Sequence, residues 1–251
     1  MMKEKIISER ILRQKTVVSF LVFVLLFAAG IFLWTALKNS SKQNGQGIVY
    51  PLRKGLMAND ALFRSTFNVA KLVKTYPVSE AVKKVRVNGN VGMRGMLEEN
   101  TWKMGVVRAD GDTTYFTLND ITRLPKTEIV YDFKCIEGWS QKTWWGGVRF
   151  SDFIKGFHLE KEAQSQYVGL ITPDGAYYVG IDQPSMMHPQ TLLCYEMNGA
   201  PLPQNQGYPL RLIIPVKYGI KSIKRIGTIF FSNNRPPDYW AERGYDYYSG
   251  H

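Results

Sequence analysis

The stretch Asp132-Phe133-Lys134-Cys135-Ile136-Glu137-Gly138-Trp139-Ser140 places a cysteine at the end of an alternating run. Ile129, Tyr131 and Phe133 share the parity of Cys135, so the pattern predicts a strand that points this cysteine to a buried side. A thiolate is a soft ligand for transition metals, whereas an isolated buried cysteine is more often a small core residue. The strand is therefore predicted, and both roles of Cys135 stay open at this point.

Glycines and tryptophans follow the predicted strand. They are Gly138, Trp139, Trp144, Trp145, Gly146 and Gly147. Glycine lets a backbone approach a flat ligand closely, and aromatic rings can stack on one, although they pack cores more often. We therefore expect a glycine- and aromatic-rich loop after Cys135.

A second cluster lies between residues 192 and 215. Asn198-Gly199 predicts a hairpin, and Gly207-Tyr208-Pro209 introduces a further strand. Arg211 is the only charged residue from Tyr208 to Val216. A cation in such a run needs an anionic partner, which is either a bound phosphate or a carboxylate of the protein.

Taken in order, these motifs resemble the sulfite oxidase family of molybdopterin enzymes. The resemblance rests on Cys135–Ser140, Leu193–Pro203 and Gly207–Arg211, and Arg235-Pro236-Pro237 is similar to the bacterial protein-methionine-sulfoxide reductase branch. It covers roughly residues 85 to 247. It implies an α+β, strand-dominated, sulfite-oxidase-type molybdopterin-binding fold, and a metal-cofactor-dependent oxidoreductase.

The same resemblance implies roles for individual residues. Cys135 falls on the thiolate ligand of a single molybdenum held by one pyranopterin, and Arg211 falls on the arginine that binds its phosphate. Further cofactor contacts are implied at Asn88, Thr172, Gln206, Ser222, Ile223 and Lys224. Tyr177 falls on an active-site tyrosine, and Glu137 on a carboxylate that could relay protons.

The chain also departs from the family pattern. Gln206 stands where Asn or His is usual, and the asparagine-rich aromatic motif of the bacterial branch is missing, with Arg86-Val87-Asn88-Gly89 in its place. Lys103 stands near the position of a substrate-site arginine of sulfite oxidases, and a lysine is a point charge without the bidentate fork. This argues against sulfite as the substrate.

Thr16 to Leu37 is an uncharged, largely apolar run of about the length that crosses a bilayer. More basic residues precede the run than follow it closely, which predicts a cytoplasmic N-terminus and a periplasmic domain at a bacterial inner membrane. The alternative is a domain facing the cytoplasm, since Arg10 and Arg13 form no twin-arginine signal. The expected division is a basic segment (1–15), a transmembrane anchor (16–37), a linker (38–60) and an oxidoreductase domain (61–251).

Composition limits the partners. The 251 residues carry a net charge of +11, but the basic residues are scattered, so a nucleic-acid partner is not expected. No Cys-x-x-Cys-His occurs, so no haem is expected in this chain. Short helices are predicted at 59–75, 119–124 and 151–157, the first capped by Asn59-Asp60.

These patterns favour a membrane-anchored molybdopterin oxidoreductase that transfers an oxygen atom on a sulfoxide, a sulfite-like ion or another small oxyanion. Its electrons would come from a membrane haem or quinone-linked partner, because the chain shows no second redox centre. One alternative is a metal-free tethered binding or scaffold module that keeps the fold. A thiol-redox protein that uses Cys135 and Cys194 is less favoured, because their spacing fits no thioredoxin-type pair.

Overall fold

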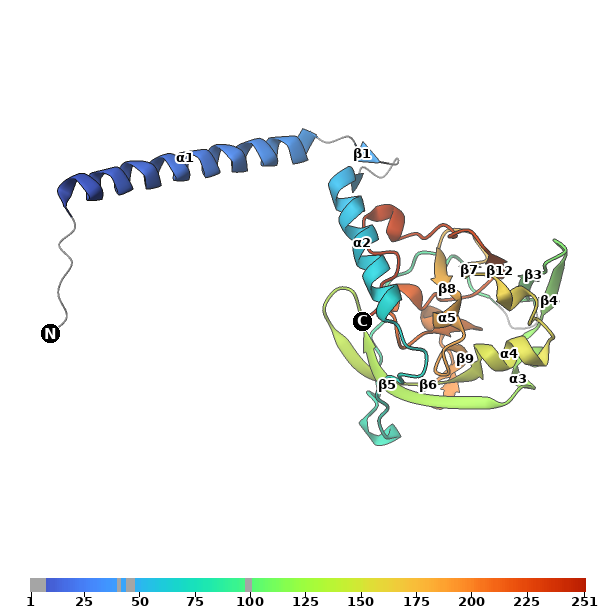
Figure 1. Cartoon of the computed structure of the whole chain (residues 1–251). Helices are drawn as coiled ribbons and strands as arrows, with labels where there is room; N and C mark the ends of the chain where they lie inside the picture. The colour runs from blue at the N-terminus through green and yellow to red at the C-terminus, as the bar shows by residue number, and fades with distance from the viewer. Residues whose placement is uncertain (1–7, 40–41, 44–47, 98–100) are drawn as a thin grey trace. The chain divides into compact units, whose positions relative to one another are not determined.

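The computed structural model describes residues 8–39, 42–43, 48–97 and 101–251 (Figure 1). The chain divides into two units, Met1–Lys54 and Gly55–His251. The first contains helix α1 (Glu9–Asn39) and the short antiparallel pair β1 (Lys42–Gln43) and β2 (Ile48–Val49). Among the described residues, α1 alone is both long and apolar enough to cross a membrane. None of its residues is buried, and the run predicted to span the bilayer lies within it.

Two five-stranded sheets form the second unit. One has the order β10-β9-β6-β5, with β11 also paired to β9; its strands are β5 (Lys126–Lys134), β6 (Ser140–Arg149), β9 (Leu192–Met197), β10 (Ala200–Pro201) and β11 (Arg211–Ile213). The other has the order β4-β3-β12-β7-β8; its strands are β3 (Met104–Val107), β4 (Thr113–Phe116), β7 (Tyr167–Ile171), β8 (Tyr178–Asp182) and β12 (Thr228–Ser232). Among the described strands of these two sheets, only the β3–β12 pair is parallel.

Apart from α2, the helical segments of the second unit are short (Figure 1). The α-helices are α2 (Tyr50–Thr66), which begins before the unit boundary, α3 (Leu118–Thr122), α4 (Phe150–Gly156) and α5 (Gln183–Met186). The 3-10 turns are η1 (Val78–Glu80), η2 (Glu162–Gln164), η3 (Gln204–Gln206), η4 (Gly219–Lys221) and η5 (Ala241–Arg243). The strand-dominated α+β class is therefore confirmed.

One apolar core joins the two sheets. Val148 and Leu212 from one sheet and Leu170 and Ile229 from the other are fully buried in the same cluster. Apolar side chains contributed by both sheets leave water together, which is the main stabilising term for such a domain. This shared core fixes the ends of the strands that carry the pocket described below.

Several turns follow directly from the local sequence. Asn198 and Gly199, both with positive φ, connect β9 to β10 as the predicted two-residue hairpin. Thr117 and Asp120 form a reciprocal capping box at the start of α3. The predicted helices near 119–124 and 151–157 are confirmed as α3 and α4.

The predicted helix at 59–75 is wrong. Asn59 and Asp60 do not cap a helix; they lie inside α2, which ends at Thr66. Both side chains have partners in the second unit instead: Asn59 donates to Asp246 (3.0 Å), and Asp60 pairs with Arg235. Asn59 and Asp60, although good capping residues, make tertiary contacts in this fold.

The predicted glycine-rich loop is also shorter than expected. Trp144, Trp145, Gly146 and Gly147 belong to β6, and only the five residues Cys135–Trp139 connect it to β5. A bulge falls between Gly146 and Gly147, where a β-carbon on Gly147 would lie 2.2 Å from the carbonyl oxygen of Leu193. Glycine here serves the close approach of β9 to β6 and not a ligand.

Candidate active site

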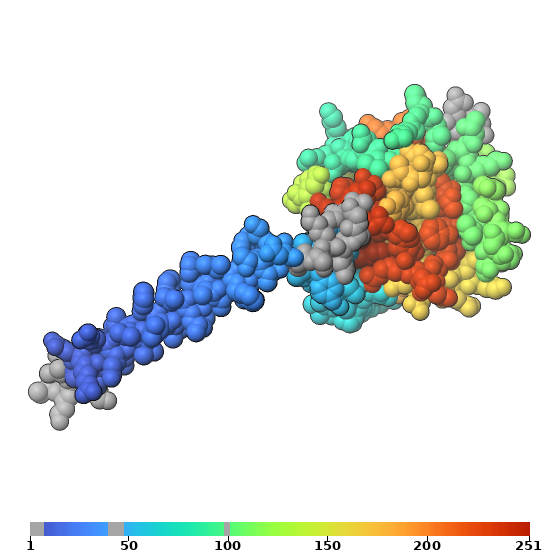
Figure 2. All heavy atoms as spheres, turned by 90° about the horizontal axis from the view of Figure 1, so that it is seen from above, coloured from blue at the N-terminus to red at the C-terminus, as the bar shows by residue number. Residues whose placement is uncertain are grey.

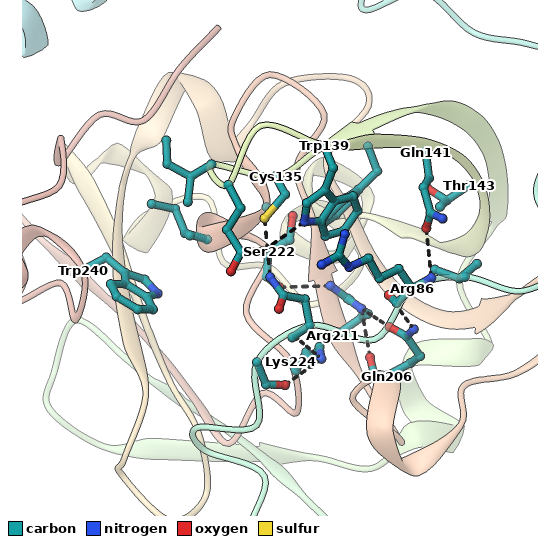
Figure 3. A pocket seen from close by; sticks show the side chains of 18 of the residues that line it. Arg86, Cys135, Trp139, Gln141, Thr143, Gln206, Arg211, Ser222, Lys224 and Trp240 are labelled. Carbon is teal, nitrogen blue, oxygen red and sulfur yellow. Dashed lines mark hydrogen bonds between the residues drawn. The ribbon is translucent and has the colours of Figure 1, made fainter.

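A pocket opens near Cys135, where the turn after β5, the segment after β11 and residues 85–91 of the second unit converge (Figure 3). Its walls come from parts of the sequence that are up to 160 residues apart. The side chains that matter below are Arg86, Asn88, Val91, Cys135, Glu137, Trp139, Trp145, Tyr177, Gln206, Arg211, Ile220, Ser222, Lys224, Trp240 and Tyr245.

The β5–β6 turn presents Cys135 to this pocket. The Cys135 amide donates to the carbonyl of Trp139 (2.9 Å), and Gly138, with a φ of 87°, donates to the carbonyl of Cys135 (3.1 Å). Cys135 is 6 % exposed, and its Sγ accepts a hydrogen bond from Asn88 Nδ2 at 3.5 Å. The sulfur is therefore held at the wall of a cavity and not sealed in the core.

The other cysteine lies in a different environment. Cys194 is fully buried in β9, and its thiol donates to the carbonyl of Glu196 (3.1 Å). Burial raises the pKa of Cys194 to about 12, so it stays a neutral thiol. The two cysteines are not bonded to each other.

Arg211 is a buried cation whose partners in the described structure are all neutral. Its guanidinium donates to the carbonyl (3.0 Å) and side-chain oxygen (3.1 Å) of Gln206 and to the carbonyl of Ser222 (3.2 Å). It lies 4.7 Å from the ring centre of Trp145, and its Nε is buried without a hydrogen-bond partner. Burial lowers the pKa of Arg211, and no carboxylate opposes this effect.

Lys224 adds a second cation of the same kind. Its Nζ donates to the carbonyls of Asn88 (2.6 Å), Gly89 (3.0 Å) and Asn205 (3.2 Å). Burial, and then the charge of Arg211, lower the pKa of Lys224 to about 7. Two neighbouring cations and an orphaned guanidinium nitrogen fit a phosphate-bearing ligand, because an anion would compensate both charges.

The segment from Val82 to Leu97, which we call the strap, covers one side of the pocket. It contains no helix or strand in its described course. Side chains from the rest of the domain hold its main-chain carbonyls, and these side chains are Asn198, Gln204, Gln206, Lys224 and Arg225. The strap thereby places Asn88 next to the Cys135 sulfur.

Tyr177 points its hydroxyl into the same region. The hydroxyl donates to the carbonyl of Ile220 (2.6 Å), and the ring packs against Tyr239 with the ring centres 5.1 Å apart. Burial first, and then the charge of Asp238, raise the pKa of Tyr177, so that its proton stays in place at neutral pH. The Tyr177 amide donates to Thr172 Oγ1 (3.1 Å), which fixes the start of β8.

Glu137 is the only carboxylate among the described residues that line the pocket. Its side chain is exposed and accepts a hydrogen bond from the Trp139 indole (3.1 Å). Hydrogen bonds from Trp139 and Asn88, and the charge of Arg86, lower the pKa of Glu137. It is therefore ionised at neutral pH and able to accept a proton from solvent.

The pocket brings together all but two of the residues predicted from the sequence. Thr172 and Ile223 do not line it. Thr172 is buried beside the strap residue Gly92 and acts on the position of Tyr177, while Ile223 is a core residue whose carbonyl accepts from the Leu212 amide (2.9 Å). Lys103 is exposed and lies outside the pocket.

Sequence reasoning did not single out several lining residues. Among them are Arg86, Ile220, Trp240 and Tyr245. Trp240 and Tyr245 could not be recognised as pocket residues from the sequence, because a tryptophan and a tyrosine near a terminus are common core residues. Arg86 was noted only as part of the strap sequence.

The residues that form the pocket fall largely within a known protein family. The model of the oxidoreductase molybdopterin binding domain matches residues 90–240. These residues include the thiolate turn, both cations and most of the pocket, and so define a molybdopterin-binding oxidoreductase. The chain belongs to this family, which is the sulfite oxidase family that the motifs indicated.

Curated relatives lie in the methionine-sulfoxide reductase branch. The chain is 32 % identical over 186 residues to a protein of Azospira oryzae named as a candidate protein-methionine-sulfoxide reductase subunit, YedZ1, covering 73 % of this chain and 70 % of that one. It is 31 % identical to the protein-methionine-sulfoxide reductase catalytic subunit MsrP of Ralstonia nicotianae, covering 62 % and 52 %. The MsrP of Xanthomonas campestris is 38 % identical over 129 residues, covering 46 % and 39 %. The chain thus spans about half or less of the length of these two MsrP relatives.

A solved structure supports the fold. The sulfane dehydrogenase SoxCD from Paracoccus pantotrophus matches with a TM-score of 0.50 and 16 % identity, over 56 % of this chain and 40 % of that one. The sulfite-oxidase-type fold and the oxidoreductase class are therefore confirmed.

Proposed function

We propose that this chain is a membrane-anchored, molybdopterin-dependent reductase of methionine sulfoxide. Its domain would face the periplasm, with residues 1–15 in the cytoplasm, 16–37 in the bilayer, 38–60 as a linker and 61–251 as the oxidoreductase domain. The names of the curated relatives and their identity to this chain support the substrate class. The apolar α1 and the basic residues before it support the anchor and its orientation.

The observation that carries this proposal is the pairing of Cys135 with two uncompensated cations in one pocket. Cys135 would ligate the molybdenum, and Arg211 and Lys224 would hold the phosphate of the pterin. Gln206, Ser222 and Asn88 line the space between them and offer polar groups to the pterin. When bound, the cofactor supplies oxygen-atom transfer chemistry, which the protein side chains cannot perform.

The remaining work falls to residues of the chain. Reduction of a sulfoxide to a thioether takes up two electrons and two protons and releases water. Tyr177 carries a proton on its hydroxyl at neutral pH, close to the pocket wall that also bears Cys135. Glu137, ionised and exposed, would pass protons from solvent toward the pocket.

The electrons need a partner. The chain would receive them from a membrane haem protein or a quinone-linked subunit, because the described side chains offer no electron carrier of their own. Tethering by α1 would keep the domain close to such a partner at the bilayer surface, which raises its local concentration.

Elemental analysis tests the cofactor. Full-length protein purified from membranes of cells that supply the cofactor is expected to contain molybdenum near one atom per chain. Cys135→Ser should abolish this, whereas Cys194→Ser, which keeps the donor to Glu196, should not. Metal-free wild-type protein would contradict the proposal and favour a scaffold module that keeps only the fold.

An assay then tests the substrate. Protein loaded with molybdenum should oxidise a reduced viologen dye in the presence of methionine sulfoxide and release methionine. Loaded protein that is inactive with sulfoxide and active with sulfite would contradict the proposed direction and substrate.

A further inference from the structure

The cations of the pocket gather on one side of it. Its cationic lining residues are Arg86, Arg211 and Lys224, which we call the charged side. In Figure 3, Trp240 lies on one side of Cys135, and Arg86 and Gln206 lie on the other. The cofactor proposed above would use the charged side, which leaves the Trp240 side for a second molecule.

Aromatic rings build the side around Trp240. Trp240 and Tyr245 meet edge to face with their ring centres 5.0 Å apart, and Tyr239 bridges Trp240 (5.3 Å) to Tyr177 (5.1 Å). Tyr245 is 38 % exposed, and the C-terminal residues, red in Figure 2, reach the surface of the second unit. Val91 and Ile220 add apolar surface to the same pocket. A molecule entering from solvent would meet these rings.

A buried ion pair holds this aromatic group in place. Asp238 accepts hydrogen bonds from the amides of Ala241 (3.0 Å) and Gly180 (3.2 Å), and it pairs with Lys221, which is 1 % exposed. The turn that carries Trp240 is thereby fixed against β8. Because the position is rigid, Trp240 can present a preformed surface to a ligand.

Trp240 is also linked to the proposed proton donor through Tyr239. The Tyr177 ring packs on Tyr239, which packs on Trp240, and the Tyr177 hydroxyl donates to the carbonyl of Ile220. These contacts fix the direction of the hydroxyl. Trp240 is therefore placed to act on both the substrate and Tyr177.

We propose that Trp240 and Tyr245 form the subsite for the uncharged substituents on the sulfur of the substrate, and that Trp240 is also a positioning residue for Tyr177. Sulfur and methyl groups pack favourably against aromatic faces and edges. An anionic substrate would need a cation on this side of Cys135, and the charged lining residues near the pterin phosphate site do not provide one there. This inference rests on the proposed function and adds to it a determinant of selectivity for neutral sulfoxides.

Two variants of the full-length, molybdenum-loaded protein test the subsite. For N-acetyl-methionine sulfoxide methylamide, Trp240→Ala and Tyr245→Ala should each lower kcat/KM about tenfold or more, mainly through KM. Activity toward sulfite, however small, should not fall in parallel. Tyr115→Ala is the matched control, since Tyr115 is 65 % exposed and lies outside the pocket.

Trp240→Phe separates the two roles. It keeps an aromatic face for the substrate but reduces the ring contact with Tyr239 that supports Tyr177, so KM should stay near the wild-type value while kcat falls and its pH profile shifts. Binding of the same amide to the loaded, oxidised protein, measured by ligand-observed NMR, should weaken in Trp240→Ala and not in Trp240→Phe.

The outcomes distinguish the two proposals. Loaded wild-type protein that reduces no sulfoxide would overturn the proposed function. Loaded wild-type protein that is active, with Trp240→Ala and Tyr245→Ala unchanged or equally impaired toward sulfoxide and sulfite, would overturn only the subsite. Loss of molybdenum from Tyr245→Ala would also overturn it, because the residue would then serve the cofactor.

Discussion

Two sets of buried or half-buried cations lie within a few residues of each other in the chain, and they differ in what balances their charge. Lys217 and Lys221 pair with Asp182 and Asp238. Arg211 and Lys224 instead donate to carbonyl and amide oxygens, and the described structure gives them no carboxylate.

This difference separates a structural role from a binding role. A buried charge is stable only when an opposite charge or enough hydrogen bonds compensate it. The aspartates complete the first set within the protein, whereas a bound anion would complete the second set. This contrast supports the proposal that the phosphate end of the pocket lies at Arg211 and Lys224.

Breaking a compensated pair should have the largest effect. Asp238→Ala leaves Lys221 charged and buried, and it also removes the acceptor of two amides. We expect the free energy of unfolding to fall by about 3–5 kcal/mol, measured by urea denaturation.

An exposed ion pair provides the control for this loss. Lys126→Met removes the pairs with Glu128 and Glu196, which lie at the surface, and should change stability by about 1 kcal/mol or less. Equal losses in both variants would mean that burial does not distinguish these pairs.

Arg211→Met should separate stability from binding. In cofactor-free protein it removes a desolvated, uncompensated charge, so stability should stay equal or rise. Retention of the pterin during dialysis should fall about tenfold to a hundredfold, since hydrogen bonds to a charged group contribute about 1.5–3 kcal/mol. Lys103→Met should leave retention unchanged, because Lys103 lies outside the pocket. A large loss of stability in cofactor-free Arg211→Met would place this arginine in the structural set.

Lys224 predicts a pH dependence. Its pKa in the folded, cofactor-free protein, about 7, lies below that of an unfolded lysine, so the unfolded state binds more protons above pH 7. The contribution of Lys224 to the free energy of unfolding therefore rises as the pH increases from 7 toward 10. Anion binding weakens over the same range, because it needs the charged form of Lys224. Sulfate affinity, measured by calorimetry, should fall by up to about tenfold from pH 6 to pH 8.

The arginine variant tests the cause of that dependence. Lys224→Arg keeps its charge across this pH range, so its sulfate affinity should be nearly constant. A dependence that persists in Lys224→Arg would assign the titration to another group.

The smallest effect concerns the thiolate itself. Asn88→Ala removes the donor to Cys135 Sγ at 3.5 Å, a long and weak contact. Molybdenum should be retained, and its reduction potential should move down by tens of mV, as followed by a redox titration with electron paramagnetic resonance. Loss of the metal in this variant would show that Asn88 holds the strap in place and does more than tune the sulfur.

The residues that the sequence identified are those with an unusual chemical setting. Cys135 at the end of an alternating strand and Arg211 in an apolar run both carry a local signal. Trp240 and Tyr245 carry none, because their role depends on long-range contacts that bring the C-terminal turn beside Tyr177. Asn59 and Asp60 misled the helix prediction, because strong capping residues also serve as ordinary hydrogen-bonding partners.

The hydrogen bonds that hold the strap affect how far its sequence can vary. Its anchors hold main-chain carbonyls, which every amino acid provides, so most strap side chains are free to change while the path of the chain is kept. Lineages can therefore diverge widely here without losing the wall of the pocket. A comparison of sequences alone would not detect such a region even where its backbone path is conserved. This accounts for the missing asparagine-rich aromatic motif in a chain that keeps the fold of the family.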